Sequence, residues 1–194
     1  MAKKIKVLLV DDENGFARLF KKKITRDPRF YYLGHASCKT SGFEKSCKLE
    51  PDIVVMDFYL AGDYFEGIGL AKEIRLKTKA KIVFLTRFEN PSIMHEANKK
   101  AFASGYVFKS QMNNIADIIY DAATKNTPLK LEIQESVRKE LTSTQILVLD
   151  SMLKDNKEIL NYAATKTIVN HKTKIYKKLG LKNKKELLHV FSNW

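Results

Sequence analysis

The alternation of short apolar runs with longer amphipathic stretches is the feature that most constrains the fold of this 194-residue chain. The apolar runs have the length and β-branched content of buried strands, and they lie at residues 5–10, 31–36, 53–57, 81–86 and 105–108. Helical patterns fall between and after them, near residues 15–23, 40–49, 68–76, 91–102 and 112–123. Five such repeats predict a doubly wound α/β domain, with a parallel five-stranded sheet covered by helices on both faces.

The pattern changes after Ala123, which indicates a second domain. Residues 124–140 contain one proline and mixed charges, and we interpret them as a linker that becomes helical toward its end. From Leu141 onward the pattern is helical only, which predicts a small all-α domain over residues 141–194. Charge supports this division, because residues 1–123 carry 21 basic and 15 acidic side chains, whereas residues 124–194 carry 14 and 7.

The formal net charge of +13 predicts an acidic partner, either nucleic acid or an anionic membrane surface. The apolar run 7–10 is interrupted by acids after four residues, so it is too short for a signal peptide or a membrane span, and we expect no membrane association. Cys38 and Cys47 match no metal-binding spacing. We expect them to be reduced thiols in a cytoplasmic protein.

Chemically distinctive residues follow four of the predicted strands: Asp11 with Asp12, then Asp57, Thr86 and Lys109. The carboxyl ends of parallel strands meet at one edge of a sheet, so these side chains are expected to lie together. Clustered carboxylates repel one another, and a hard oxygen site of this kind suits Mg²⁺. A carboxylate beside the metal can attack a phosphoryl group, whose oxygens a hydroxyl and a lysine can stabilise.

This order of residues resembles the receiver domain of bacterial two-component response regulators, which has a flavodoxin-like fold. The resemblance covers about the first 120 residues, a common size for one domain. It implies that Asp57 is the phosphoacceptor. It also implies an Mg²⁺ held by Asp57, Asp11, Asp12 and the backbone carbonyl of Tyr59.

The same resemblance assigns contacts with the phosphoryl group to Thr86 and Lys109, and a switch between two states to Thr86 and Tyr106. The chain departs from the family pattern in two places. The loop after the acceptor is two residues longer than usual, with Ala61 where a proline is common. Ser110 stands where a proline is usual after the lysine, which removes an expected cis peptide bond.

The C-terminal segment predicts a helix with one apolar and one basic face. Thr142 is placed to cap a preceding helix, and Gly180 is placed to end this one. The apolar face has helical spacing and comprises Ile168, His171, Ile175 and Leu179. Eight lysines and no acid lie between Lys166 and Lys185. Such a helix suits docking against a nucleic acid backbone.

Residues 141–194 resemble the LuxR-type helix-turn-helix domain found at the C-termini of many response regulators. In that family the third helix enters the major groove of DNA, and here it would begin near Thr165. The residues expected to contact DNA are Lys166, Thr167, Asn170, Lys172, Lys174 and Lys178. The chain has two residues fewer than the family pattern between Glu158 and Thr167, which predicts a shortened turn, and Gln145 replaces an acid.

Together the two resemblances imply a cytoplasmic transcription regulator that is not an enzyme. A sensor histidine kinase would phosphorylate Asp57 with Mg²⁺ present, and the protein would bind DNA as a homodimer that can depend on phosphorylation. Two alternatives remain open. The altered helix-turn-helix could bind a protein instead of DNA, or the acids could form a small Mg²⁺-dependent phosphatase, for which the sequence offers no evident substrate pocket or general base.

Overall fold

A computed structural model describes residues 3–87, 90–154 and 165–192. The chain divides into two compact units, Met1–Leu131 and Glu132–Trp194. The division falls within helix α6 (Pro128–Lys139), so most of the predicted linker is helical. The physical reason is a short apolar face, because Ile133 and Val137 are one helical turn apart and both are buried.

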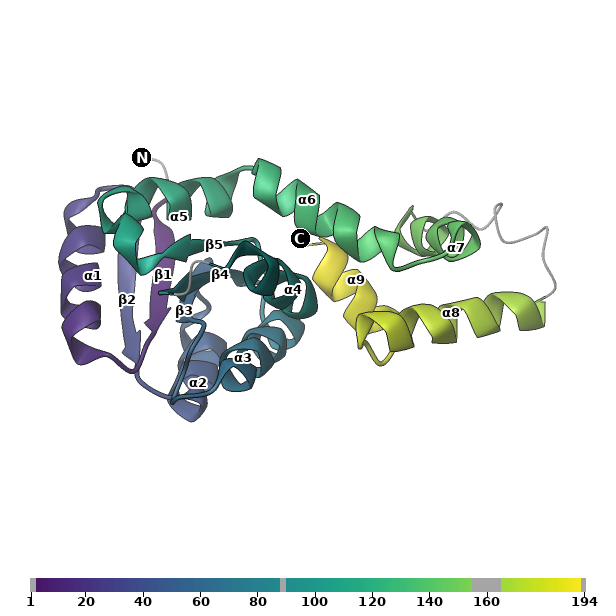
Figure 1. The fold of residues 1–194 in the computed structure, drawn as a ribbon, viewed down its shortest axis with the longest axis horizontal. Helices are drawn as coiled ribbons and strands as arrows, with labels where there is room; N and C mark the ends of the chain where they lie inside the picture. Colours follow the sequence, from purple (N-terminus) through teal and green to yellow (C-terminus); the bar gives the residue numbers. More distant parts are fainter. Residues whose placement is uncertain (1–2, 88–89, 155–164, 193–194) are drawn as a thin grey trace. The chain divides into compact units, whose positions relative to one another are not determined.

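The first unit contains a five-stranded sheet in the order β2-β1-β3-β4-β5, with every neighbouring pair parallel (Figure 1). The strands are β1 (Ile5–Val10), β2 (Phe30–Ala36), β3 (Ile53–Asp57), β4 (Lys81–Thr86) and β5 (Gly105–Phe108). Four of the five strands have the predicted bounds, and β2 begins one residue earlier. The predicted fold class of this unit is confirmed.

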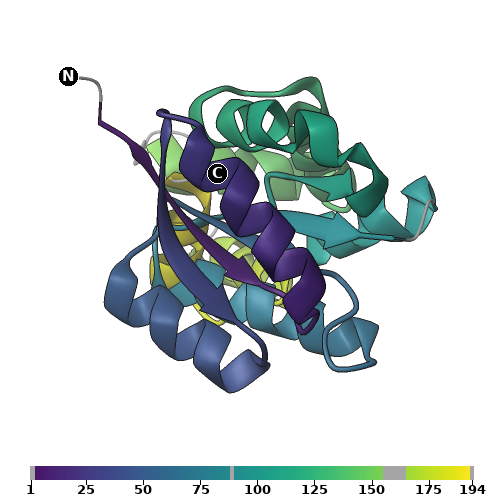
Figure 2. The same cartoon turned by 90° about the vertical axis from the view of Figure 1, so that its left-hand side faces the viewer.

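Helices cover both faces of the sheet. The helices are α1 (Asn14–Arg26), α2 (Lys39–Leu49), α3 (Tyr64–Lys77), α4 (Pro91–Ala101) and α5 (Ile115–Thr124), with a 3₁₀ helix η1 (Lys109–Asn114) before α5. Alternate residues of β1 belong to different cores: Val7 and Leu9 pack with α1 and α5, whereas Leu8 and Val10 pack with α3 and α4. Figure 2 shows α1 and α2 on opposite sides of β1 and β2.

The strand register brings the ends of β1, β3, β4 and β5 to one edge. Val10 is paired with Met56, Asp57 with Leu85, and Thr86 with Phe108. Helix α3 approaches this edge closely, because a Cβ atom on Gly67 would lie 2.7 Å from the carbonyl oxygen of Phe58. Only glycine fits there, so the backbone after Asp57 is held directly against the first turn of α3.

The second unit consists of helices, namely the rest of α6 with α7 (Ser143–Lys154), α8 (Thr165–Leu179) and α9 (Lys184–Ser192). Thr142 caps α7 as predicted. Its hydroxyl accepts a hydrogen bond from the backbone of Gln145, and the Gln145 side chain accepts one from the backbone of Thr142. Gln145 therefore completes a capping box. Gly180 ends α8 in a left-handed conformation, with φ of 61°.

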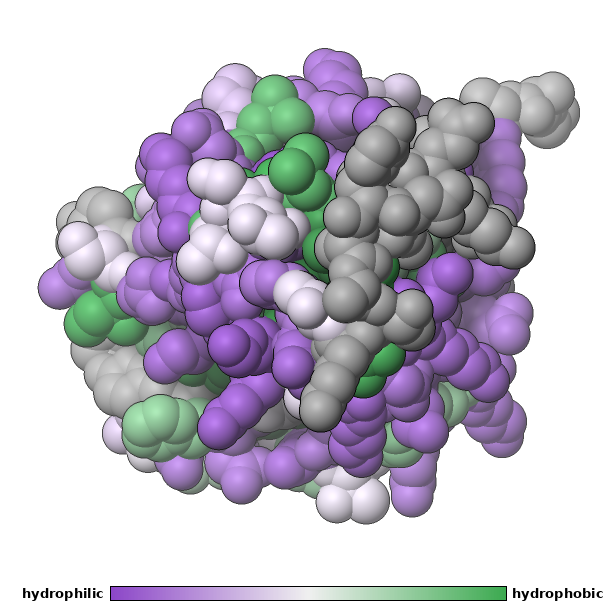
Figure 3. All heavy atoms as spheres, turned by 90° about the vertical axis from the view of Figure 1, so that its right-hand side faces the viewer, coloured by the Kyte–Doolittle hydropathy of each residue, from purple (hydrophilic) through white to green (hydrophobic). Residues whose placement is uncertain are grey.

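Polar side chains dominate the outer surface of the chain on the side drawn in Figure 3, where apolar patches are small. Among the described residues, none of the helices combines the length and the apolar content that crossing a membrane requires.

Candidate functional site

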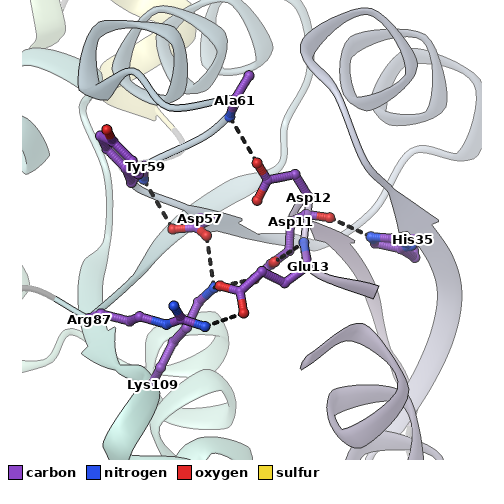
Figure 4. A network of polar contacts seen from close by, with 9 residues as sticks. All are labelled: Asp11, Asp12, Glu13, His35, Asp57, Tyr59, Ala61, Arg87 and Lys109. Atoms are coloured by element: carbon purple, nitrogen blue, oxygen red, sulfur yellow. Dashed lines mark hydrogen bonds and ion pairs between the residues drawn. The ribbon is translucent and has the colours of Figure 1, made fainter. Parts of the chain in front are cut away.

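The predicted acidic site lies at the carboxyl edge of the sheet (Figure 4). Asp11 follows β1, Asp57 is the last residue of β3, and Lys109 follows β5. The side chains of these three residues are 0, 7 and 6% exposed, respectively. Three ionisable groups from distant parts of the sequence therefore share one site from which water is largely excluded.

The ammonium group of Lys109 is the centre of this site. Its Nζ lies 2.8 Å from Asp11 Oδ2, 2.8 Å from Asp57 Oδ2 and 2.8 Å from Glu13 Oε1. It also lies 4.7 Å from the centroid of the Phe16 ring, within the range of a cation–π interaction. One ammonium therefore neutralises part of the charge of three carboxylates at once.

Burial and pairing act against each other on the ionisation of these groups. Burial raises the pKa of both Asp11 and Asp57, although hydrogen bonds from Lys109 lower it. For Lys109, burial lowers the pKa, but its hydrogen bonds to the three carboxylates outweigh burial and raise it. A hydrogen bond from Lys109 lowers the pKa of Glu13. The site therefore stabilises a charged lysine and penalises its two buried carboxylates, which further positive charge would relieve.

Three carboxylates can offer ligands to one cation. Oxygen atoms of Asp11, Asp12 and Asp57 all lie within 4.8 Å of one another. The second Asp57 oxygen, Oδ1, accepts a 3.0 Å hydrogen bond from the backbone of Tyr59, and Asp12 Oδ2 accepts one of 3.2 Å from the backbone of Ala61. The donor set consists of hard oxygens, with Asp11 and Asp57 buried and Asp12 exposed, so these residues fit an ion such as Mg²⁺ that also keeps water ligands.

The two remaining receiver positions also reach this part of the fold. Thr86 is buried and is the last residue of β4. Tyr106 lies on β5, packs against the core beneath α4, and its ring centroid is 5.5 Å from that of Phe108. The structure therefore brings Thr86 to the same sheet edge as Asp57, whereas Tyr106 lies further back on its strand.

Both departures from the family pattern have local structure. In the longer loop Ala61 and Gly62 have φ of 54° and 81°, and the backbone N–H of Asp63 donates to Leu60 O. Asp63 then caps α3 through a 2.8 Å hydrogen bond from the backbone of Phe65. Ser110 lies in η1, and the described residues contain no cis peptide bond. Neither departure removes a side chain from the acidic site.

Three residues that contact this site were not among the predicted site residues. Arg87 donates a hydrogen bond to Glu13 Oε2, and Glu13 in turn binds Lys109. His35, on β2, places its Nε2 2.5 Å from the carbonyl oxygen of Asp11. The available signal was position alone, because His35 and Arg87 lie at or directly after the carboxyl end of a strand and Glu13 lies three residues after β1.

The predicted DNA-binding residues lie on α8. Ile168, Ile175 and Leu179 are buried on one side, whereas Thr167, Asn170 and Lys174 are exposed and Lys172 is half-buried. Lys178 is engaged within its own unit, where its Nζ donates to Glu140 O at 2.7 Å and to Gln145 Oε1 at 3.0 Å. The side chain of Lys166 and the predicted shortened turn, within residues 155–164, lie outside the described residues.

Known proteins match this chain along most of its length. The family model of the response regulator receiver domain matches residues 7–120. The transcriptional regulatory protein YdfI of Bacillus subtilis (strain 168) is 27% identical over 203 residues, which cover 95% of this chain and 94% of YdfI. The oxygen regulatory protein NreC of Staphylococcus carnosus (strain TM300) is 23% identical over 207 residues, with 95% of each chain covered.

Solved structures agree on the fold. RcsB from Salmonella enterica serovar Typhimurium, bound to promoter rprA, matches with a TM-score of 0.57 and 22% identity, covering 98% of this chain and 99% of RcsB. The predicted resemblance to response regulators with a receiver domain and a C-terminal LuxR-type domain is thereby confirmed. The acidic site with its central lysine lies inside the matched receiver region, and the chain belongs to the response regulator receiver domain family.

Proposed function

We propose that this chain is a transcription regulator controlled by phosphorylation of Asp57, with a sensor histidine kinase as the phosphodonor and DNA as the target of the C-terminal unit. The observation that carries the proposal is the lysine-centred site, in which Lys109 Nζ lies 2.8 Å from Asp57 and contacts two further carboxylates. The hydrogen bond from Lys109 lowers the pKa of this carboxylate against the effect of burial, which favours the ionised form that a nucleophile needs.

The transfer itself needs little covalent chemistry from the protein. An Asp57 oxygen attacks phosphorus, the bond from phosphorus to the donor imidazole breaks, and the imidazole leaves with the bonding electron pair. Lys109 and the Thr86 hydroxyl would then bind oxygens of the phosphoryl group. Mg²⁺ would be held by Asp11, Asp12, Asp57 and the carbonyl of Tyr59, and when bound it supplies positive charge against those oxygens.

Phosphorylation would change the partners of groups at the sheet edge. A phosphoryl group adds negative charge and oxygen acceptors beside Lys109 and Thr86, which favours an arrangement in which both contact it. We infer that Tyr106, on the neighbouring strand, changes its packing together with Thr86. The resulting change in surface would alter homodimerisation of the chain.

The basic face of α8 supports DNA as the partner. Thr167, Asn170 and Lys174 are exposed, Lys172 is half-buried, and the opposite face of the helix is committed to the core. Lysines on such a face bind phosphates, whereas an exposed amide can read a base edge. YdfI, a transcriptional regulatory protein, and RcsB, whose structure was solved bound to a promoter, support the same partner. A protein of this kind acts in the cytoplasm, without turnover of a substrate of its own.

The test uses the full chain and a random pool of DNA duplexes, with and without beryllofluoride, an analogue of the phosphoryl group. We expect selection of particular sequences and an increase in affinity on addition of the analogue. The Asp57→Asn variant should bind DNA without responding to it. Absence of DNA binding at low salt by folded protein would contradict the DNA proposal and favour a protein partner, and steady hydrolysis of a phosphate ester would favour the phosphatase.

A further inference from the structure

A polar chain of contacts runs from solvent to the acceptor carboxylate (Figure 4). Arg87, whose side chain is 65% exposed, donates to one oxygen of Glu13. The other oxygen of Glu13 accepts from Lys109 Nζ at 2.8 Å, and the same Nζ donates to Asp57 Oδ2 at 2.8 Å. Arg87 is thus the member of this chain nearest to solvent.

Sheet order places this arginine beside the acceptor. Glu13 follows β1 and Arg87 follows β4, while β3 is paired with both of these strands. The Arg87–Glu13 ion pair therefore spans the end of β3, where Asp57 lies. A phosphodonor that reaches Asp57 from solvent arrives next to the guanidinium group.

The charges at this edge favour such a contact. Asp11, Asp12, Glu13 and Asp57 supply four carboxylates, and they face two cations, Lys109 and Arg87. Phosphorylation converts the Asp57 carboxylate into an acyl phosphate with more negative charge. Lys109 is already shared among three carboxylates. A second cation, Arg87, that turns toward the phosphoryl oxygens would therefore lower the free energy of the transition state for phosphoryl transfer.

We propose that Arg87 is a catalytic residue for phosphorylation of Asp57, and that its guanidinium group exchanges Glu13 for oxygens of the incoming phosphoryl group. This inference rests on the proposed function. The planar guanidinium can bind two phosphoryl oxygens at once, as it binds a carboxylate. With acetyl phosphate as donor, an Asp57 oxygen attacks phosphorus, the bond from phosphorus to the acetate oxygen breaks, and acetate leaves with the electron pair.

The experiment measures the second-order rate constant for phosphorylation of the full chain by acetyl phosphate in the presence of Mg²⁺. Arg87→Ala should lower this constant about tenfold, less than loss of a buried oxyanion contact costs, because water screens the exposed arginine. Arg87→Lys should restore part of the rate. The matched control is Arg26→Ala, which removes an exposed arginine at the far end of α1 and should leave the rate unchanged.

A second pair of variants separates contact with the phosphoryl group from simple positioning of Glu13. If Arg87 binds the phosphoryl group, Arg87→Ala should cost at least as large a factor in a Glu13→Gln background as in the wild type, because the guanidinium then has no ion pair with Glu13 to break. Loss of the effect in that background, or an unchanged rate in Arg87→Ala alone, would overturn the inference. Failure of the proposed function would give a different result. In that case acetyl phosphate would not add to the wild type any phosphoryl group that Asp57→Asn removes.

Discussion

Replacement of Lys109 by methionine should destabilise the receiver unit when Mg²⁺ is absent. The variant keeps an apolar side chain of similar length but removes the ammonium that contacts Asp11, Asp57 and Glu13. Removal of one partner from a buried ion pair costs about 3–5 kcal/mol, because the remaining charge stays buried without compensation. Glu13 adds little to this cost, since its side chain is 36% exposed and therefore screened by water.

We expect a loss near the lower end of this range, about 3 kcal/mol, because Asp11 and Asp57 can protonate in the variant. The first unit comprises residues Met1–Leu131. For a unit of this size the entropy of unfolding is about 0.3 kcal/mol per degree, so the melting temperature should fall by roughly 10 °C. The matched control is Lys125→Met, which removes an exposed ion pair with Asp121 and should leave the melting temperature nearly unchanged.

The deficit of Lys109→Met should depend on pH with a defined sign. Burial raises the pKa of Asp11 and Asp57 above the ordinary aspartate value of 3.8, and loss of the ammonium raises both further. A carboxyl group whose folded-state pKa is raised destabilises the fold above that pKa, and the loss is recovered as pH falls toward 3.8. The difference in melting temperature between variant and wild type should therefore be largest at neutral pH and shrink on acidification.

Thermal unfolding followed by circular dichroism, at several pH values and with or without Mg²⁺, measures this prediction. Added Mg²⁺ should stabilise the variant more than the wild type, because the divalent cation replaces the missing ammonium between Asp11 and Asp57. A variant as stable as the wild type at neutral pH without Mg²⁺ would refute the reasoning. A deficit independent of pH would show that lost packing of the lysine stem, rather than uncompensated charge, is the cause.

Four further predictions concern the acceptor, the cation site and α8. Asp57→Asn should abolish the single acid-labile phosphoryl group that acetyl phosphate adds, as mass spectrometry of the intact chain would detect, because an amide is not a nucleophile. Asp12→Asn should raise the metal-free melting temperature and weaken Mg²⁺ binding in calorimetry, since one repelling carboxylate is removed; unchanged Mg²⁺ affinity would count against the site. Lys172→Ala with Lys174→Ala should weaken binding to all duplexes and flatten the salt dependence by about one unit per lost contact. Asn170→Ala should instead cost about 1–3 kcal/mol at one base position.

The strands could be predicted because each contains a short run of mostly apolar residues, whereas several helix boundaries could not be predicted. Helix α3 begins at Tyr64, four residues before the predicted start. Its first turn lacks the apolar spacing of a half-buried helix, since the apolar residue Phe65 is 78% exposed. Gly67, which the close approach to the end of β3 requires, is also a weak helix former. The sequence did not predict that helix α6 begins as early as Pro128 in the linker. The reason is related, because the apolar face formed by Ile133 and Val137 is too short to give a clear helical period among the charged residues.

The candidate site, too, could be predicted from the sequence only in part. Asp11, Asp57 and Lys109 could be predicted to meet, because any parallel sheet brings the carboxyl ends of its strands to one edge. The ion pair between Glu13 and Arg87, which are 74 residues apart, could not be predicted in this way. It depends on the order β1-β3-β4, which places the acceptor strand between the two residues, and on side-chain directions after the strands end. Strand order follows from packing of the whole unit, so it leaves no local pattern in the sequence. The residue that we propose to bind the incoming phosphoryl group therefore becomes visible only when the three strands are placed side by side.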